Sequence, residues 1–164
     1  MQTINMKRID KIIHHDLFDN LMSQIRENET GLIFCCHGMG HSLDVARIAY
    51  IINLEEQYAL AKDIIYAAAL LHDIGRAALS DTEKNHHVMS GEYAERILTD
   101  AGYDELEREQ ILEAILMHNT DGLDKPGLPG LLYKADKLSR LCFSCEAYDD
   151  CYWIDAEKNS GVLY

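Results

Sequence analysis

The chain of 164 residues is long enough for one domain with a substantial core, and short for two. Hydrophobic residues make up 48% of the chain and only two prolines occur, as in a folded globular protein. The net charge of -13 argues against duplex nucleic acid as a partner, since such a partner needs a basic surface.

No apolar run reaches the length that spans a membrane, and the N-terminal stretch lacks a signal-peptide core. We therefore expect a cytoplasmic protein that does not bind membranes. Five cysteines in such a compartment indicate reduced thiols or a metal site rather than disulfides. The acidic charge does not exclude a small phosphorylated substrate, because bound metal ions would invert the local field.

Apolar periodicity predicts an all-α bundle of about six or seven helices. The first helical region covers residues 3–27, in two pieces. Residues 31–34 fit either a strand or a helix, and Cys35 and Cys36 are expected in the core. In the next helix His37 and His41 are four residues apart, so they would project from one side.

The central buried helix is expected over residues 61–71, with His72 and Asp73 at its C-terminal end and Gly75 as a left-handed stop. Residues 80–83 have the spacing of a capping box. After residues 85–91, a helix is expected to run through Ala94, Ile97 and Leu98 to Gly102. Further helices are expected from 104 to His118 and over 131–141, with a loop at 119–130. The predicted organisation is one helical domain of residues 1–141, with a tail of residues 142–164 packed on it.

Several chemically active side chains lie at predicted helix ends or on otherwise apolar faces. A buried carboxylate is costly unless it is paired or bound to a cation. Imidazoles suit first-row metals, and a carboxylate can bridge two ions. One such histidine is more often a satisfied core residue, but six residues of this kind are hard to explain by packing. The candidate metal ligands are His41, His72, Asp73, His87, His118 and Asp136, whereas His14, His15 and His86 are expected to face solvent.

The order His41, His72-Asp73 and Asp136, with Ile-Gly-Arg after the His-Asp pair, resembles the signature of the HD superfamily of metal-dependent phosphohydrolases. The resemblance covers residues 36–140. It implies an all-α domain of the HD type that holds a divalent metal through these four residues.

The additional His87 and His118 resemble the two-metal version of this domain. That version occurs in HD-GYP-like phosphodiesterases and in bacterial diiron hydrolases of symmetrical diadenosine tetraphosphate. Residues 114–118 and 132–137 look closest to the latter. No GYP segment follows, so hydrolysis of cyclic dinucleotides is not expected, and the cysteine-containing tail is foreign to the tetraphosphate hydrolases.

The resemblance implies that Asp73 bridges two ions, with His41, His72 and Asp136 on one and His87 and His118 on the other. Iron or manganese is expected, with zinc, nickel or magnesium as further candidates. Metal-bound water of lowered pKa would attack a phosphoryl group. Asp73 and Arg76 are the candidate catalytic residues, since Arg76 could bind a phosphate oxygen, although it could also be a surface cation.

Other residues have more than one interpretation. His37 could be a further ligand, a hydrogen-bond partner of a ligand or a substrate contact. Lys137 and Arg140 could contact substrate or pair with Asp136. Cys142, Cys145 and Cys151 could belong to a structural zinc site, whose fourth ligand would come from Cys35, Cys36 or a histidine. Alternatively they are reduced thiols beside Phe143 and Trp153, which would pack against the end of the bundle.

The favoured function is hydrolysis of a phosphate ester or anhydride of a small nucleotide-like substrate. One alternative is a diiron oxygenase of the HD type, and another is a metal-containing module that senses a nucleotide without turnover. Both a monomer and a homodimer fit the acidic composition.

Overall fold

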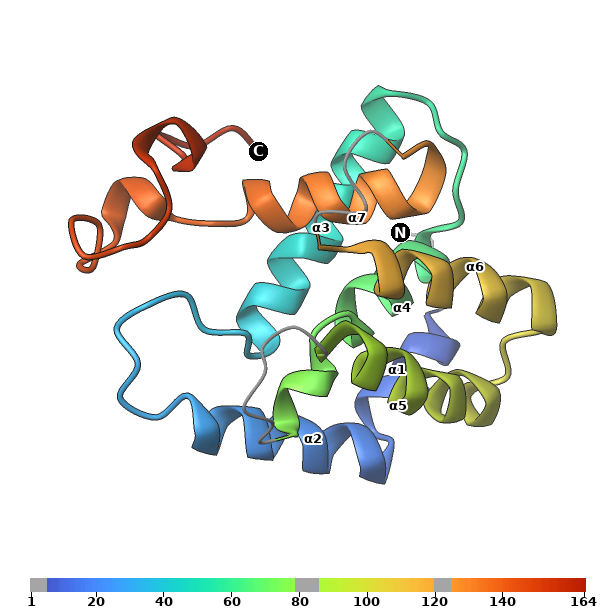
Figure 1. The fold of residues 1–164 in the computed structure, drawn as a ribbon. Helices are drawn as coiled ribbons and strands as arrows, with labels where there is room; N and C mark the ends of the chain where they lie inside the picture. Colours follow the sequence, from blue (N-terminus) through green and yellow to red (C-terminus); the bar gives the residue numbers. More distant parts are fainter. Residues whose placement is uncertain (1–5, 79–85, 120–124) are drawn as a thin grey trace.

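The computed structural model describes residues 6–78, 86–119 and 125–164. In these ranges the chain forms seven α-helices, short 3-10 turns and no strand, so the predicted all-α fold is confirmed (Figure 1). The helices are α1 (Lys7–Ile13), α2 (Asp16–Asn28), α3 (Met39–Glu55), α4 (Lys62–Leu71), α5 (His86–Ala101), α6 (Glu105–Met117) and α7 (Gly127–Leu138).

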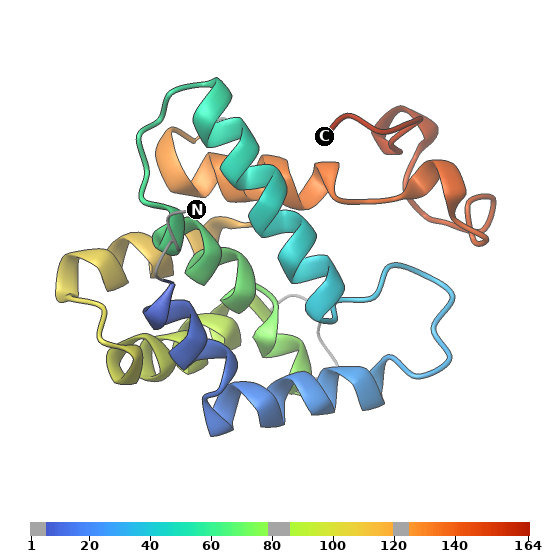
Figure 2. The same cartoon turned by 180° about the vertical axis from the view of Figure 1, so that it is seen from behind.

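Helix α4 is the centre of the bundle, as its apolar sequence predicts. All but one of the residues from Ile64 to Leu71 are buried, and α4 contacts α1, α3, α5, α6 and α7. Seen from both sides, it runs through the middle of the molecule with the other helices around it (Figures 1 and 2). Its C-terminal end therefore carries the next residues, His72 and Asp73, into the interior.

The turn after α4 brings the chain very close to α5. Residues Ile74–Ala77 form a 3-10 turn, η1, which packs against α5 and α2. A Cβ on Gly75 would lie 2.0 Å from the His86 carbonyl oxygen and 2.5 Å from the Ser90 amide nitrogen. Gly75 does not have a positive φ, so the expected left-handed stop is wrong. Glycine is needed here because there is no room for a side chain.

The segment before α3 differs from the prediction. Leu32, Ile33 and Phe34 form an exposed loop instead of a strand or helix, after Gly31 turns the chain with a φ of +85°. Cys35 and Cys36 are exposed in the same loop, so their expected place in the core is wrong.

The start of α7 also differs from the prediction. The helix begins at Gly127 instead of residue 131, because Pro126 occupies the N-cap and Pro129 lies in the first turn, where a missing N–H breaks no helical bond. The predicted capping box at residues 80–83 lies outside the described residues. None of the helices in the described ranges is long and apolar enough to cross a membrane.

The tail turns back on the C-terminal end of α7. The Trp153 ring lies 3.9 Å from the guanidinium carbon of Arg140. The side-chain amide of Asn159 donates hydrogen bonds to the carbonyl oxygens of Lys137, at 2.9 Å, and Arg140, at 2.8 Å. Phe143 is exposed and does not pack against the bundle. The tail thus closes the end of the helix that carries Asp136.

Candidate metal centre

Five helices meet at a cluster of imidazoles and carboxylates. His41 lies in the first turn of α3, His72 and Asp73 follow α4, and Asp136 lies in the last turns of α7. Two further histidines come from the start of α5 and the end of α6. His72, Asp73, Asp136 and the α6 residue His118 are all buried.

The first group of donor atoms consists of His41, His72 and Asp73, whose ligand atoms all lie within 4.8 Å of one another. The Nε2 atoms of His41 and His72 are 3.3 Å apart. Asp73 Oδ2 is 3.1 Å from His72 Nε2 and 3.6 Å from His41 Nε2. Asp136 adjoins this group, since its Oδ1 is 3.3 Å from His41 Nε2. The four residues of the predicted first ligand set therefore lie together.

The second group consists of Asp73, His86 and His118, again within 4.8 Å of one another. The two Nε2 atoms are 3.1 Å apart. Asp73 faces this group with its other oxygen, Oδ1, which is 3.4 Å from His86 Nε2 and 3.5 Å from His118 Nε2. One carboxylate thus lies between two donor groups, with one oxygen directed to each.

The second group differs from the prediction by one residue. His86 occupies the place expected for His87, and the expectation that His86 faces solvent is wrong. Consecutive residues of a helix point about 100° apart, so a one-residue error turns a different ring toward the cluster. His87 Nδ1 lies 3.4 Å from the side-chain amide of Asn119. His86 therefore replaces His87 as the candidate ligand.

His72 and His118 direct their Nε2 atoms to the cluster because their Nδ1 atoms are hydrogen-bonded to backbone carbonyl oxygens. His72 Nδ1 lies 2.7 Å from the Ala69 carbonyl oxygen, and His118 Nδ1 lies 2.6 Å from that of Ile115. A carbonyl only accepts, so in a neutral ring Nδ1 carries the proton and Nε2 offers a lone pair. Lone pairs and carboxylate oxygens then face one another in the interior, an arrangement that a cation stabilises.

The pKa shifts of His72 and Asp73 also favour a bound cation. Burial opposes a charge on His72, but Asp73 and Asp136 outweigh burial and raise its pKa to about 10. Burial would raise the pKa of Asp73, yet His72 and the surrounding imidazoles hold it well below the usual range. The buried carboxylates therefore stabilise positive charge at this place. A divalent cation supplies that charge and leaves the imidazoles neutral.

Two neighbours of the cluster were not predicted. The Ser139 hydroxyl donates to the Asp136 carbonyl oxygen at 2.8 Å, and its oxygen lies 3.4 Å from His41 Nδ1. Glu29 accepts from the His37 backbone N–H at 2.8 Å, and its other oxygen lies 2.6 Å from His37 Nδ1. The His37 ring lies 5.5 Å from the His41 ring, centroid to centroid. Ser139 follows Asp136 by three residues, so the sequence alone places both on one helix face and could have indicated this neighbour. Nothing in the sequence connects Glu29 to the site.

The cations around the cluster are held by its carboxylates. Arg76 donates from Nε to Asp73 Oδ1 at 2.9 Å, and the Arg76 side chain is 27% exposed. Lys137 Nζ is 2.6 Å from Asp136 Oδ2. Arg140 instead stacks on the Trp153 ring, so Lys137 is the cation that contacts Asp136. Arg76 is thus a partly exposed cation in direct contact with the candidate bridging carboxylate.

Replacing Ser139 with alanine is expected to weaken divalent metal binding by about tenfold, because the His41 ring loses the oxygen that orients it. Titration of the metal-free protein against a competing chelator measures this affinity. Thr99→Ala is the control, since the Thr99 hydroxyl donates to the Glu95 carbonyl oxygen on an exposed part of α5, away from the cluster. Equal affinity of the Ser139 variant and the wild type would contradict the orienting role.

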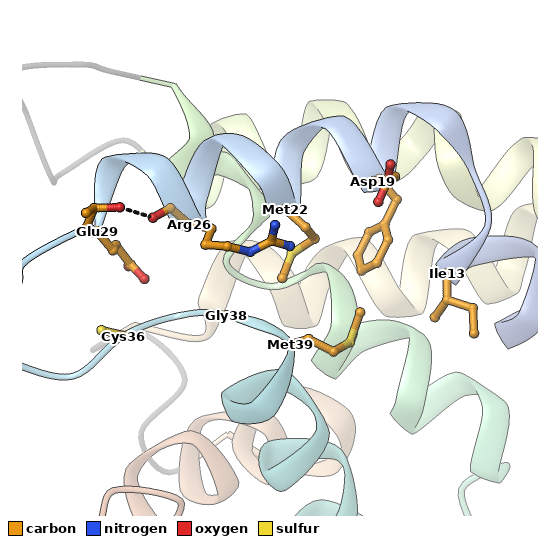
Figure 3. A pocket seen from close by; sticks show the side chains of 10 residues that line it. Ile13, Asp19, Met22, Arg26, Glu29, Cys36, Gly38 and Met39 are labelled. Carbon is orange, nitrogen blue, oxygen red and sulfur yellow. Dashed lines mark hydrogen bonds between the residues drawn. The ribbon is translucent and has the colours of Figure 1, made fainter.

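A pocket of about 420 Å³ lies between α2 and the start of α3. Its apolar lining includes Ile13, Met22 and Met39, and Arg26 and Glu29 supply charge (Figure 3). Glu29 lines the pocket and also contacts His37, whose ring lies beside that of His41 in the cluster. The volume falls in the range of small-molecule sites.

Comparison with known proteins is consistent with this geometry. A family model described as HD domain matches residues 38–141. An uncharacterized protein of Clostridium beijerinckii is 39% identical over 97% of this chain and 100% of its own length. Ribonuclease Y of Thermoanaerobacter pseudethanolicus is 29% identical over 75% of this chain and 27% of its own length. Ribonuclease Y of Clostridium kluyveri is 27% identical over 75% of this chain and 26% of its own length. The chain thus spans about a quarter of the Ribonuclease Y proteins. No solved structure shows significant similarity.

Proposed function

Because the chain belongs to the HD-domain family, whose members are typically metal-dependent phosphohydrolases, we propose that it hydrolyses a phosphate ester or anhydride of a small nucleotide-like substrate. The observation that carries the proposal is the placement of Asp73, with one oxygen directed to each of two donor groups. Such an arrangement suits a pair of ions that share a carboxylate.

The proposed ligands of one ion are His41, His72, Asp73 and Asp136. Those of the other are Asp73, His86 and His118. Imidazole and carboxylate together suit iron, manganese or zinc. When bound, the ions would supply a water of lowered pKa and neutralise charge on a phosphoryl oxygen.

The protein's own groups would orient the substrate. Arg76 holds Asp73 through Nε, and its partly exposed guanidinium is the proposed contact of a phosphate oxygen. Lys137 offsets part of the charge on Asp136 and so limits repulsion of an anionic substrate. The pocket beside His37 is the proposed place for the organic part of the substrate, because its methionines adapt to different shapes.

A small substrate is favoured over a long RNA. The name of the Ribonuclease Y relatives indicates hydrolysis of RNA phosphodiesters by those proteins, but this chain matches only about a quarter of their length. The net charge of -13 would repel an extended polyanion. A dinucleoside polyphosphate or a nucleotide places its charge at the metal centre and its base in a pocket.

The proposal is tested by phosphate release and product analysis on nucleotides, dinucleoside polyphosphates and a short RNA. Wild-type protein would be stripped with a chelator and reloaded with manganese or iron under anaerobic conditions. We expect hydrolysis of a small substrate that stops on stripping and returns on reloading. Turnover that requires oxygen would favour the oxygenase alternative. Nucleotide binding without turnover under any metal would favour a sensing module.

A further inference from the structure

All five cysteines of the chain lie outside the hydrophobic core. Cys35 and Cys36 are exposed in the loop of residues 31–38, and Cys142, Cys145 and Cys151 are half-buried in the tail. Cysteine is normally among the most buried residue types, so this placement requires an explanation. The loop and the tail lie on the same side of the molecule in both views (Figures 1 and 2).

The first two tail cysteines form a tight turn. Residues Cys142–Ser144 are a 3-10 helix, η4, in which the Ser144 amide donates to the Leu141 carbonyl at 3.0 Å. The Cys145 amide donates to the Cys142 carbonyl at 3.2 Å, and the Tyr148 amide donates to the Cys145 carbonyl at 3.2 Å. A pair of cysteines separated by two residues in such a turn is the usual half of a structural zinc site.

Of the two loop cysteines, Cys35 is the one that interacts electrostatically with the tail cysteines. Partial burial raises the pKa of the Cys35 thiol, the thiols of Cys142, Cys145 and Cys151 raise it further, and the guanidinium of Arg140 lowers it. The loop of residues 31–38 lies on the same side of the molecule as the tail, so a movement of this loop would bring Cys35 toward the three tail thiols (Figures 1 and 2). Cys36 belongs to a different environment, since it lines the pocket near Glu29 (Figure 3).

We propose that Cys35, Cys142, Cys145 and Cys151 form a tetrahedral zinc site that is separate from the histidine–carboxylate centre. In the described residues no three of these thiols lie within 4.8 Å of one another, so zinc binding would draw the tail cysteines together and the loop of residues 31–38 toward them. Four thiolates leave a zinc site with a net negative charge. Arg140 and Lys158, which interacts electrostatically with Cys151, offset that charge within an otherwise acidic chain.

The tail has little hydrophobic core of its own. Ala147 is the one buried hydrophobic side chain of the described tail, residues 142–164, whereas Phe143, Tyr152 and Ile154 are exposed. A segment with so little core usually depends on a metal or a disulfide, and a reducing compartment favours the metal. Zinc would join the tail to the loop that leads into His37 and α3. This proposal does not depend on the reaction proposed above.

The test is X-ray absorption at the zinc edge on full-length protein purified anaerobically after growth with zinc. The expected spectrum contains sulfur neighbours at about 2.3 Å, which are distinct from nitrogen or oxygen neighbours at about 2.0–2.1 Å in the histidine–carboxylate centre. Cys145→Ser should remove most of the sulfur signal. The matched control, Cys36→Ser, should retain it.

Cobalt substitution gives a second readout, and its wild-type spectrum does not depend on the folding of any variant. Tetrahedral thiolate coordination produces an intense cobalt–sulfur absorption in the wild type, and we expect it to disappear in Cys35→Ser and persist in Cys36→Ser. Zinc with only nitrogen and oxygen neighbours in the wild type would overturn the proposal. An iron–sulfur chromophore, or a sulfur signal lost in Cys36→Ser and kept in Cys145→Ser, would overturn it as well.

Discussion

Replacing Asp73 with asparagine is expected to lower the proposed phosphohydrolase activity by at least about 100-fold and to leave at most one tightly bound ion. The aspartate directs Oδ2 toward His41 and His72 and Oδ1 toward His86 and His118. An asparagine of the same shape has only one oxygen to offer and no negative charge, so it cannot serve both groups. Metal content per chain, measured by mass spectrometry after desalting, checks the expectation together with the assay.

The matched control is Asp44→Asn, which removes an exposed carboxylate on α3 that pairs with Arg47. That variant should keep its metal content and activity, since it does not touch the cluster. Circular dichroism establishes that the Asp73 variant is folded, so that loss of metal is not a consequence of unfolding. Two ions and full activity in Asp73→Asn would refute the bridging role.

Gly75→Ala is expected to lower the free energy of unfolding by about 3 kcal/mol and to reduce metal binding. The added Cβ would meet two backbone atoms, the His86 oxygen at 2.0 Å and the Ser90 nitrogen at 2.5 Å. Backbone cannot rotate away as a side chain can, so the first turn of α5 must move. His86 would then leave its place beside Asp73 and His118.

Chemical denaturation of the metal-free protein measures the stability of this variant, and metal titration measures its affinity. Gly40→Ala is the control, because a Cβ at Gly40, in the first turn of α3, meets no atom within 4 Å. That substitution should be neutral or stabilise the chain by about 0.5 kcal/mol. Similar stabilities for the two variants would show that the contact between η1 and α5 is not rigid.

Most of the fold follows from apolar periodicity. The apolar residues of α4 mark it as the central helix, and the chain after it carries His72 and Asp73 into the cluster as predicted. The predicted elements are wrong where the local sequence pattern fits more than one structure. Leu32 to Phe34 are hydrophobic but remain exposed among the described residues, and α7 starts before Pro129, a residue that usually signals a loop.

The site was predictable to the extent that its residues lie at helix ends. Two adjacent histidines, His86 and His87, have the same local sequence context, and only the start of α5 decides which ring faces Asp73. The partnership of Glu29 with His37 depends on how the loop before α3 returns to α2, which no periodic pattern encodes. Supporting residues of this kind are defined by tertiary contacts.

The side-chain amide of Asn159 donates to carbonyl oxygens at the end of α7, and Lys158 donates to the Tyr148 carbonyl oxygen at 2.8 Å. The terminal carbonyls of a helix have no partner of their own. A residue beyond the segment that matches the family thus completes the helix that holds Asp136. We therefore expect the cooperative folding unit to extend past residue 141, so that unfolding of the tail loosens the helix that carries Asp136.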